Sequence, residues 1–395
     1  MSFDVFAGLR VLDFSRVLAG PSATRVLADF GADVIKVQAR KTSGSAEDNE
    51  QPYFAAWNRN KRSIVLDMQL PEARRAALDL VRKCDVVIEN FAPRVLDNWG
   101  LDYAALRQEN QSIILMRMSA GGQTGPWRNH VAFGPTVHAL SGLTHLTAYP
   151  EGTPIGPGFA YADVVAGLYA ALAIAAAVYS RAHTGQGQCI DLSEYEALVG
   201  LLGPSLIALQ AGENEIALTK VLAEPAPAAP YGYFRCQGSD QWCAIAVFDD
   251  AQWQALCEVL HLEHVGRDTR FANVAARNRN SAELHSVVEA RTAERRASEL
   301  ALHLQDKGVP SSAVKDARDL SGDPQLVERG FFVRLKHPAR GEYLCDRGAV
   351  RLGCDGAPQW MPAPSLGQDT DHLFRNLLGW SPDKIAAFRR RGIIG

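Results

Sequence analysis

The sequence predicts an α/β protein that combines a large domain, built on a parallel β-sheet, with a smaller α+β domain. Two observations support this fold class. Between residues 9 and 118, short apolar strands alternate with helical stretches, a pattern that gives a parallel sheet covered by helices on both faces. At residues 223–230 the composition changes to alanine and proline, which is typical of a semi-rigid linker.

The individual elements follow from apolar runs separated by glycine, proline and polar residues. Strands of the large domain are expected at residues 9–14, 33–37, 63–66, 85–88, 113–118 and 189–192. Its helices are expected at residues 19–29, 71–83, 92–99, 164–179 and 194–211. After the linker we expect a strand pair at residues 231–235 and 241–247, polar helices up to residue 304, then short strands and an amphipathic stretch at residues 369–378.

Composition favours a cytoplasmic, globular enzyme. The net charge of −3, from 41 basic and 44 acidic residues, gives no support for nucleic-acid or membrane-surface binding. The 7 cysteines form no CxxC pair and no Cys/His zinc spacing, which fits a reduced compartment and predicts no metal site. The first residues have no basic n-region and no long apolar h-region, so we expect no export signal. The run at residues 164–179 would span about 24 Å as a helix, short of the roughly 30 Å bilayer core.

Asp163 is the strongest candidate for chemistry. It is a lone acid that precedes the longest apolar run and follows a loop rich in glycine and proline at residues 154–158. At the start of a buried helix, free backbone N–H groups and the helix dipole favour an ionised carboxylate, which is a plausible nucleophile toward an activated acyl group. The alternative is that Asp163 is an ordinary helix N-cap.

Other motifs exclude several cofactors. The first strand–turn–helix carries Ala19-Gly20-Pro21-Ser22 in place of GxGxxG, and the second strand ends at Gln38 where an NAD site would place an acid. We therefore expect no NAD site. The spacing of His130, His138 and His145 does not supply a compact metal site. Glycine-rich turns at residues 120–126 and 154–158 would let the backbone approach a ligand closely.

Several separate motifs, in a fixed order along nearly the whole chain, carry a resemblance to a known family. They include LADFGADVIKV at residues 27–37, NRNKRSI at 58–64, GQTGP at 122–126, and Asp163 with Ala166-Gly167. Further matching segments are residues 9–21, 85–93, 184–188, 308–310 and 363–367. By these motifs the chain resembles the family III CoA-transferases of the CaiB/BaiF type, which include formyl-CoA and carnitine-CoA transferases.

The resemblance implies that Asp163 is the nucleophile of an acyl-CoA:carboxylate CoA-transferase. Asp163 would attack the thioester, giving an aspartyl-acyl anhydride and CoA thiolate. The acceptor acid would then displace the first acid before CoA returns to the new acyl group, with backbone N–H groups of a glycine-rich loop stabilising the oxyanion. CoA is then a substrate, and no permanently bound cofactor is expected.

The resemblance also implies an interlocked homodimer and a Rossmann-like large domain built from both chain ends. The expected boundaries are residues 1–222 for the N-terminal part of the large domain, 223–230 for the linker, 231–320 for the small domain, and 321–395 for the segment that completes the large domain. The partners expected are therefore an acyl-CoA, a small carboxylic acid and a second copy of the chain.

By position, three segments are expected to contact CoA. Their residues are Leu18, Ala19, Leu66, Asp67, Met68, Gln69, Asn90, Phe91 and Ala92. Where family members often carry basic residues, this chain has Ala39, Ala92 and Asn98. Nearby cations are alternative partners for the CoA phosphates, namely Lys36, Arg40 and Arg94.

Departures from the family pattern bear on the substrate. Gly134-Pro135 replaces the Tyr-Glu pair of formyl-CoA transferases, which argues against an oxalate enzyme. Phe133 occupies the histidine position of the 2-methylacyl-CoA racemases, although His130 or His138 would compensate in another register. We expect Phe133, Gly134 and His138 to line an acyl pocket, with a dicarboxylic donor such as succinyl-CoA. A racemase or isomerase and a non-catalytic CoA-binding subunit are the alternatives.

Overall fold

Apart from short gaps, a computed structural model describes the chain at residues 4–40, 46–147, 153–211, 228–351 and 360–395. The chain divides into two compact units. The first contains segments from both chain ends, residues 1–206 and 330–395, and the second contains residues 207–329. Residues 223–227 of the predicted linker lie outside the described residues.

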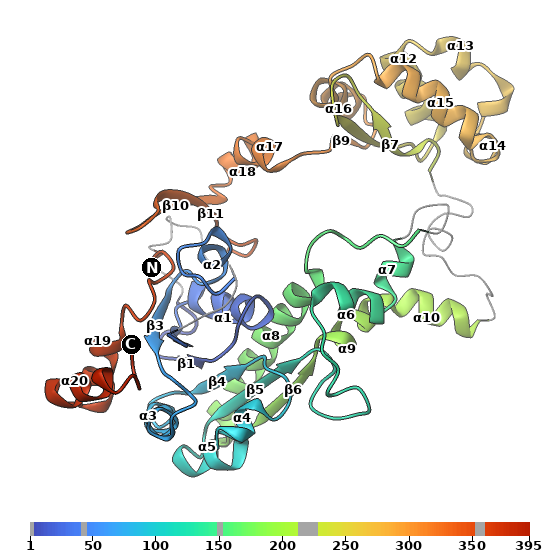
Figure 1. The fold of residues 1–395 in the computed structure, drawn as a ribbon. Helices are drawn as coiled ribbons and strands as arrows, with labels where there is room; N and C mark the ends of the chain where they lie inside the picture. Colours follow the sequence, from blue (N-terminus) through green and yellow to red (C-terminus); the bar gives the residue numbers. More distant parts are fainter. Residues whose placement is uncertain (1–3, 41–45, 148–152, 212–227, 352–359) are drawn as a thin grey trace. The chain divides into compact units, whose positions relative to one another are not determined.

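A six-stranded parallel sheet forms the centre of the first unit (Figure 1). Its strands are β1 (Arg10–Asp13), β2 (Asp33–Gln38), β3 (Lys61–Val65), β4 (Val86–Glu89), β5 (Ile114–Ser119) and β6 (Cys189–Ser193). The order β3-β2-β1-β4-β5-β6 is that of Rossmann-type sheets, and every neighbouring pair is parallel. The predicted parallel sheet is confirmed. Its order reverses between β1 and β4, the position at which such sheets bind ligands.

Helices cover both faces of this sheet because successive strand residues point to opposite sides. Val11 and Val34 pack with helices α1 (Ala19–Asp29) and α8 (Tyr161–Thr184) in one apolar cluster. Their neighbours Leu12 and Ile35 belong to a second cluster, which includes residues of α3 (Pro71–Val81), α5 (Tyr103–Glu109), α19 (Thr370–Leu378) and α20 (Pro382–Arg390). The last two helices bring the C-terminal segment into the core of the first unit.

Helix α8 is longer than predicted. It contains 24 residues and is long and apolar enough to cross a membrane by length and composition. The prediction that it is too short was wrong, because it counted only the uninterrupted apolar run and omitted both ends of the helix. The core helix of a soluble protein passes the same test. The buried residues Ala166, Ala170 and Ile174 place one face of α8 in the apolar core with α1 and the sheet.

The expected helix at residues 194–211 is divided into three pieces, so this prediction was wrong. They are α9 (Glu194–Val199), a 3-10 turn η1 (Gly200–Leu202) and α10 (Gly203–Gln210). Pro204 has no N–H for the helical ladder, and Gly200 and Gly203 weaken a continuous helix. Helices of the first unit that were not predicted are α2 (Pro52–Trp57), α5, α6 (Gly134–Leu140), α7 (Leu143–Leu146) and α20. Helix α4 (Val95–Asn98) is shorter than expected.

The second unit contains the expected strand pair. β7 (Tyr231–Arg235) and β8 (Trp242–Ala246) are antiparallel, and β9 (Ser311–Ala313) adds a third strand. Its helices are α12 (Asp250–Leu260), α13 (Glu263–Gly266), α14 (Val274–Arg279), α15 (Ser281–Thr292), α16 (Ala297–Asp306), α17 (Ala317–Ser321) and α18 (Pro324–Glu328). The hairpin β10 (Phe332–His337) and β11 (Gly341–Asp346) belongs to the first unit.

Gly167 lies at a close contact between α8 and α1, and substituting it tests this packing. A Cβ atom there would lie 1.9 Å from Ser22 Oγ and 2.8 Å from the backbone oxygen of Ala19. Gly167→Val is therefore expected to lower the free energy of unfolding in urea by about 3 kcal/mol. Gly200→Ala is the control, because a Cβ atom there meets nothing within 4 Å. Equal stability of the two variants would contradict the close packing.

Candidate active site

Asp163 lies in the first turn of α8, as its third residue. The N-cap is Ala160, so the alternative interpretation of Asp163 as the N-cap is wrong. The carboxylate is partly buried, and Oδ2 has neither solvent contact nor a hydrogen-bond partner among the described residues. An uncompensated oxygen of this kind costs free energy, which is common at functional sites.

Burial raises the pKa of Asp163 to about 6, while a hydrogen bond from its own backbone N–H lowers the pKa and only partly offsets burial. The helix start therefore does not keep this carboxyl as acidic as expected from the sequence. Desolvation dominates, yet a group with a pKa of about 6 is still mostly ionised at pH 7. The carboxylate is thus both anionic and poorly solvated, which suits a nucleophile.

His138 takes the place of a side-chain cap for α8. Its Nε2 accepts a hydrogen bond from the backbone N–H of Ala162 at 3.0 Å. Burial lowers the pKa of His138, so the ring is neutral and carries its proton on Nδ1. In this position the histidine holds the first turn of α8, next to Asp163, and its expected contact with substrate stays a prediction.

Gly134 begins α6 directly beside the carboxylate. A Cβ atom there would lie 2.6 Å from Asp163 Oδ2 and 2.8 Å from the Cβ atom of Ala160. Only glycine therefore fits against Asp163 in this arrangement. The preceding Phe133 is 68% exposed and its backbone N–H donates to Thr136 Oγ1. Both residues lie near the start of α6, and their substrate contacts stay a prediction.

The first turn of α8 lies near the predicted CoA segment at the start of α1. Gly167 is one turn beyond Asp163 and packs against the backbone of Ala19. Leu18 and Ala19 are completely buried at this helix start. Helix α1 directly follows β1, and α8 ends just before the parallel strand β6 begins, so both helices begin at the carboxyl edge of the sheet. Asp163 and the first predicted CoA segment are therefore close together.

Loops after β1, β3 and β4 bring the other predicted CoA segments to the same edge of the sheet. The Asn90 side chain accepts from Arg16 N–H at 2.7 Å and donates to Arg16 carbonyl at 2.9 Å, which ties the loops after β4 and β1 together. In the loop that follows β3, the side chains of Leu66 and Met68 are buried. The Asp67 N–H in the same loop donates to the backbone carbonyl of Ile393. Phe91 packs on Trp99, while Ala92 and Arg94 are exposed.

Lys36 does not lie where a phosphate would reach it, which corrects its predicted role. The side chain is completely buried, and Nζ donates to the Ser15 carbonyl at 2.7 Å. It shares the interior with Asp13 and Lys61, and burial lowers the pKa of Lys61 to about 7. Through this hydrogen bond, Lys36 of β2 supports the loop that follows β1. We therefore do not retain Lys36 as a partner for the CoA phosphates.

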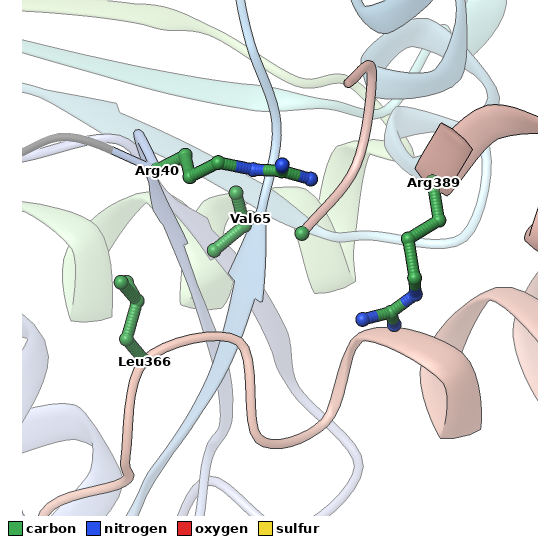
Figure 2. Close-up of a pocket in the computed structure, with 5 residues that line it drawn as sticks. Arg40, Val65, Leu366 and Arg389 are labelled. Carbon is green, nitrogen blue, oxygen red and sulfur yellow. The ribbon is translucent and has the colours of Figure 1, made fainter. Parts of the chain in front are cut away.

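Arg40 lines an open pocket of about 340 Å³ together with Val65, Leu366, Arg389 and Gly395. Figure 2 shows the Arg40 and Arg389 side chains at this pocket. Arg40 donates to the Ile394 carbonyl at 2.7 Å, and Arg389 forms an ion pair with Asp371. Two cations at one pocket can attract an anionic group, so Arg40 keeps its predicted role as a candidate.

Two further groups near Asp163 were not predicted. Burial and the charge of Asp163 raise the pKa of Glu194 to about 8, and they also raise the pKa of Tyr53. Glu194 is an acid at a helix start after a parallel strand, so the reasoning applied to Asp163 would have found it. The position of Tyr53 at the second residue of α2 leaves no comparable pattern in the sequence.

Among the described residues there is no group of three or more His, Cys, Asp or Glu side chains that could hold a metal ion. The groups described around Asp163 are the carboxyl of Glu194, backbone amides and the neutral ring of His138. An anionic carboxylate of this kind can attack an electrophilic carbonyl without a general base.

Comparisons with known proteins identify the family of the chain. The sequence model of CoA-transferase family III matches residues 6–370. The succinyl-CoA–D-citramalate CoA-transferase of Chloroflexus aurantiacus is 31% identical over 395 residues, covering 98% of this chain and 97% of that protein. The succinate–glutarate CoA-transferase of Agrobacterium fabrum is 33% identical over 385 residues, covering 94% of this chain and 95% of that protein.

Solved structures give the same result. A CaiB/BaiF family protein from Brucella suis has a TM-score of 0.85 at 31% sequence identity, covering 94% of this chain and 99% of that chain. The mixed α/β fold with a six-stranded parallel sheet and a smaller antiparallel sheet is therefore shared with that protein.

The raised pKa of Asp163 predicts a pH-dependent stability. Its folded pKa of about 6 exceeds the ordinary value of 3.8, so the stabilising effect of the proton is complete below pH 3.8 and is lost as pH rises through 6. Asp163→Asn stays neutral at every pH. Its stability relative to wild type should therefore rise by about 1 kcal/mol between pH 5 and pH 8 in urea unfolding.

The exposed Asp383, in the first turn of α20, provides the matched control as Asp383→Asn. It removes a helix-terminal charge without removing a buried carboxylate. A difference between Asp163→Asn and wild type that is constant across this pH range would contradict the raised pKa.

Proposed function

Since the chain belongs to CoA-transferase family III and is a CoA-transferase, we propose that it moves CoA from an acyl-CoA to a carboxylic acid through an acyl anhydride on Asp163. The observation that carries this mechanism is the carboxylate itself. Asp163 lies at the start of α8 with an unpartnered, solvent-shielded oxygen among the described residues. Such a group gains from forming a covalent bond, because acylation removes its poorly solvated charge.

In the proposed mechanism each step exchanges one anion for another. An Asp163 oxygen attacks the thioester carbon, the C–S bond breaks, and CoA leaves as thiolate. The acceptor carboxylate then attacks the aspartyl carbonyl carbon and releases the first acid as its carboxylate. Finally the thiolate attacks the new acyl carbon, which forms the product thioester and frees the Asp163 carboxylate. No step needs a general base.

Each of these steps passes through a tetrahedral oxyanion, which backbone N–H groups would stabilise. In the glycine-rich turn after β5, the Gln123 N–H already donates to Asp191 at 3.0 Å. This favours the other predicted turn, at residues 154–158, which precedes α8. All five residues of this turn are exposed and so are open to a ligand.

For the substrates, we propose a dicarboxylic acyl-CoA such as succinyl-CoA as donor and a small carboxylic acid as acceptor. The proposal rests on the names of the relatives, which are a succinyl-CoA–D-citramalate and a succinate–glutarate CoA-transferase. CoA would lie along the loops after β1, β3 and β4, of which the Asn90–Arg16 hydrogen bonds tie the loops after β1 and β4 together. Arg40, with Arg389 at the same pocket, and the exposed Arg94 are the candidate phosphate partners.

The racemase alternative is less well supported. A racemase of this fold needs a histidine that moves a proton beside the aspartate. Here Nε2 of His138 accepts the Ala162 N–H, and the residue at the family's histidine position is Phe133. Phe133 has no ring nitrogen, and Nε2 of His138 is already engaged by the Ala162 N–H. This arrangement favours acyl transfer over racemisation.

We also propose a homodimer in the cytoplasm. The face of α8 opposite the core exposes large apolar side chains, with Leu168 at 56%, Leu172 at 67% and Tyr179 at 70%. A contiguous apolar surface of this kind is typical of a protein–protein interface. A second copy of the chain is the occupant that the family resemblance implies.

The mechanism predicts that Asp163→Ala abolishes CoA exchange. We expect a loss of at least about 10³-fold in acid-dependent CoA transfer, because the covalent intermediate cannot form. The measurement is a screen of acyl-CoA donors against carboxylic acids, read by mass spectrometry. Full activity of Asp163→Ala would refute the mechanism, while α-proton exchange with deuterated water and no acceptor acid would support the racemase. An inactive but folded wild-type chain would favour a subunit that needs a partner.

The dimer proposal predicts that Leu172→Glu yields a monomer in light scattering, because a buried glutamate at an apolar interface is strongly unfavourable. Val5→Glu is the control, since Val5 is similarly exposed, at 61%, and lies away from α8 in sequence. A wild-type monomer, or an unchanged dimer in Leu172→Glu, would contradict an interface at this face of α8.

A further inference from the structure

We propose that Glu194 is a second functional carboxyl of this site, held in its protonated form beside Asp163 so that it donates a hydrogen bond to the oxyanion of the acyl group. This inference rests on the proposed acyl transfer at Asp163. It adds a neutral acid as hydrogen-bond donor to the backbone amides considered above.

Three helices place Glu194 in the layer that contains Asp163. Helices α6, α8 and α9 contact one another, and Figure 1 shows them in the same part of the first unit. Val137, Ala162 and Leu198, one from each helix, form a small buried cluster. Asp163 directly follows Ala162, and Glu194 is the first residue of α9. Two carboxyl groups therefore lie at helix starts within one packed layer.

The position of Glu194 has no evident structural role. The N-cap of α9 is Ser193, whose side chain accepts the Glu196 N–H at 3.2 Å, so Glu194 is not needed as a cap. An acid in the first turn of a helix is normally exposed, yet Glu194 is only 7% exposed. Burial of a carboxyl group opposes folding unless the group is neutral or compensated.

The surroundings of Glu194 favour its neutral form. The carboxyl groups on α9 and on the elements that contact it are Asp163 on α8, Asp191 on β6 and Glu196 on α9 itself. The other ionisable groups on these elements are His138 on α6, Cys189 on β6, Tyr195 on α9, and Tyr161, Tyr169, Tyr179, Arg181 and His183 on α8. Arg181 and His183 lie in the last turn of α8, away from its start, and burial keeps His138 neutral. Burial and the charge of Asp163 raise the pKa of Glu194 to about 8. Near pH 7 the two carboxyls thus hold one proton, which resides on Glu194 while Asp163 stays anionic.

A protonated carboxyl is a strong hydrogen-bond donor to an anion. In each transfer step negative charge develops on a carbonyl oxygen, and the Glu194 O–H would donate to that oxygen without giving up its proton. The carboxyl is protonated before and after each step, so the proton balance of the transfer is unchanged. A buried acid of this kind, kept neutral by its site and used as a donor, is an established device in enzymes. An ionised Glu194 would instead repel both Asp163 and the oxyanion.

Two substitutions of Glu194 distinguish hydrogen-bond donation by its carboxyl from other roles of this residue. Glu194→Gln keeps the shape and an N–H donor but cannot ionise, so we expect kcat within about 3-fold of wild type at pH 7, and no loss of rate above pH 8. Glu194→Ala removes the donor and should lower kcat about 10²-fold. Wild type should lose activity as the pH rises through 8. Circular dichroism and thermal unfolding check that each variant folds.

The outcomes distinguish the possible roles. A Glu194→Gln variant as inactive as Glu194→Ala would mean that the anion is needed, which overturns the proposal. An alanine variant as active as wild type, or a wild-type rate that does not fall above pH 8, would overturn it too. If the alanine variant does not fold, the rates of wild type and Glu194→Gln above pH 8 still test the donor role.

A readout independent of activity separates this proposal from the proposed function. The infrared carbonyl band of a protonated carboxyl, obtained as wild type minus Glu194→Gln, should be present at pH 7 and disappear near pH 8. In an Asp163→Asn background the same band should disappear at lower pH, because the charge that raises the pKa is gone. Absence of the band at pH 6 to 7 overturns the donor role, whereas CoA exchange by Asp163→Ala overturns the transferase mechanism alone.

Discussion

The close packing of α8 on α1 is the constraint on which the site depends. Gly167 has no side chain, and the backbone oxygen of Ala19 and the hydroxyl of Ser22 occupy the space that a Cβ atom would need. This contact brings the first turn of α8, with Asp163, to the start of α1 at the carboxyl edge of the sheet. The same edge carries the loops after β3 and β4, so the candidate nucleophile and the predicted CoA segments lie at one edge of the sheet.

A second constraint is the charge balance around Asp163. Burial raises the pKa of Asp163, and the charge of Asp163 together with burial raises the pKa values of Glu194 and Tyr53. The carboxylate is therefore less stable than an exposed one, and Gly134 and His138 hold it in position without neutralising it. This destabilised anion is consistent with covalent catalysis, since acylation converts it to a neutral ester-like group.

Much of the first unit could be predicted because its information is local. The strands β1 to β6 and the helices α1, α3 and α8 follow from apolar periodicity and from glycine and proline at their ends. Errors occurred where backbone chemistry interrupts an apolar run, as at Pro204, or where polar residues extend a helix, as at the end of α8. Short helices such as α2 and α6 were missed because a few residues carry too little periodicity.

By itself, the sequence determined the parallel sheet, the identity of Asp163 as the candidate nucleophile and, through its ordered motifs, the resemblance to family III CoA-transferases. Tertiary structure alone decided the environment of that carboxyl. It placed Lys36 in the interior, turned His138 toward the backbone of α8, and brought Glu194 near Asp163 although the two lie on different helices. The physical reason is that burial and electrostatic coupling depend on contacts between distant segments, which local sequence patterns do not specify.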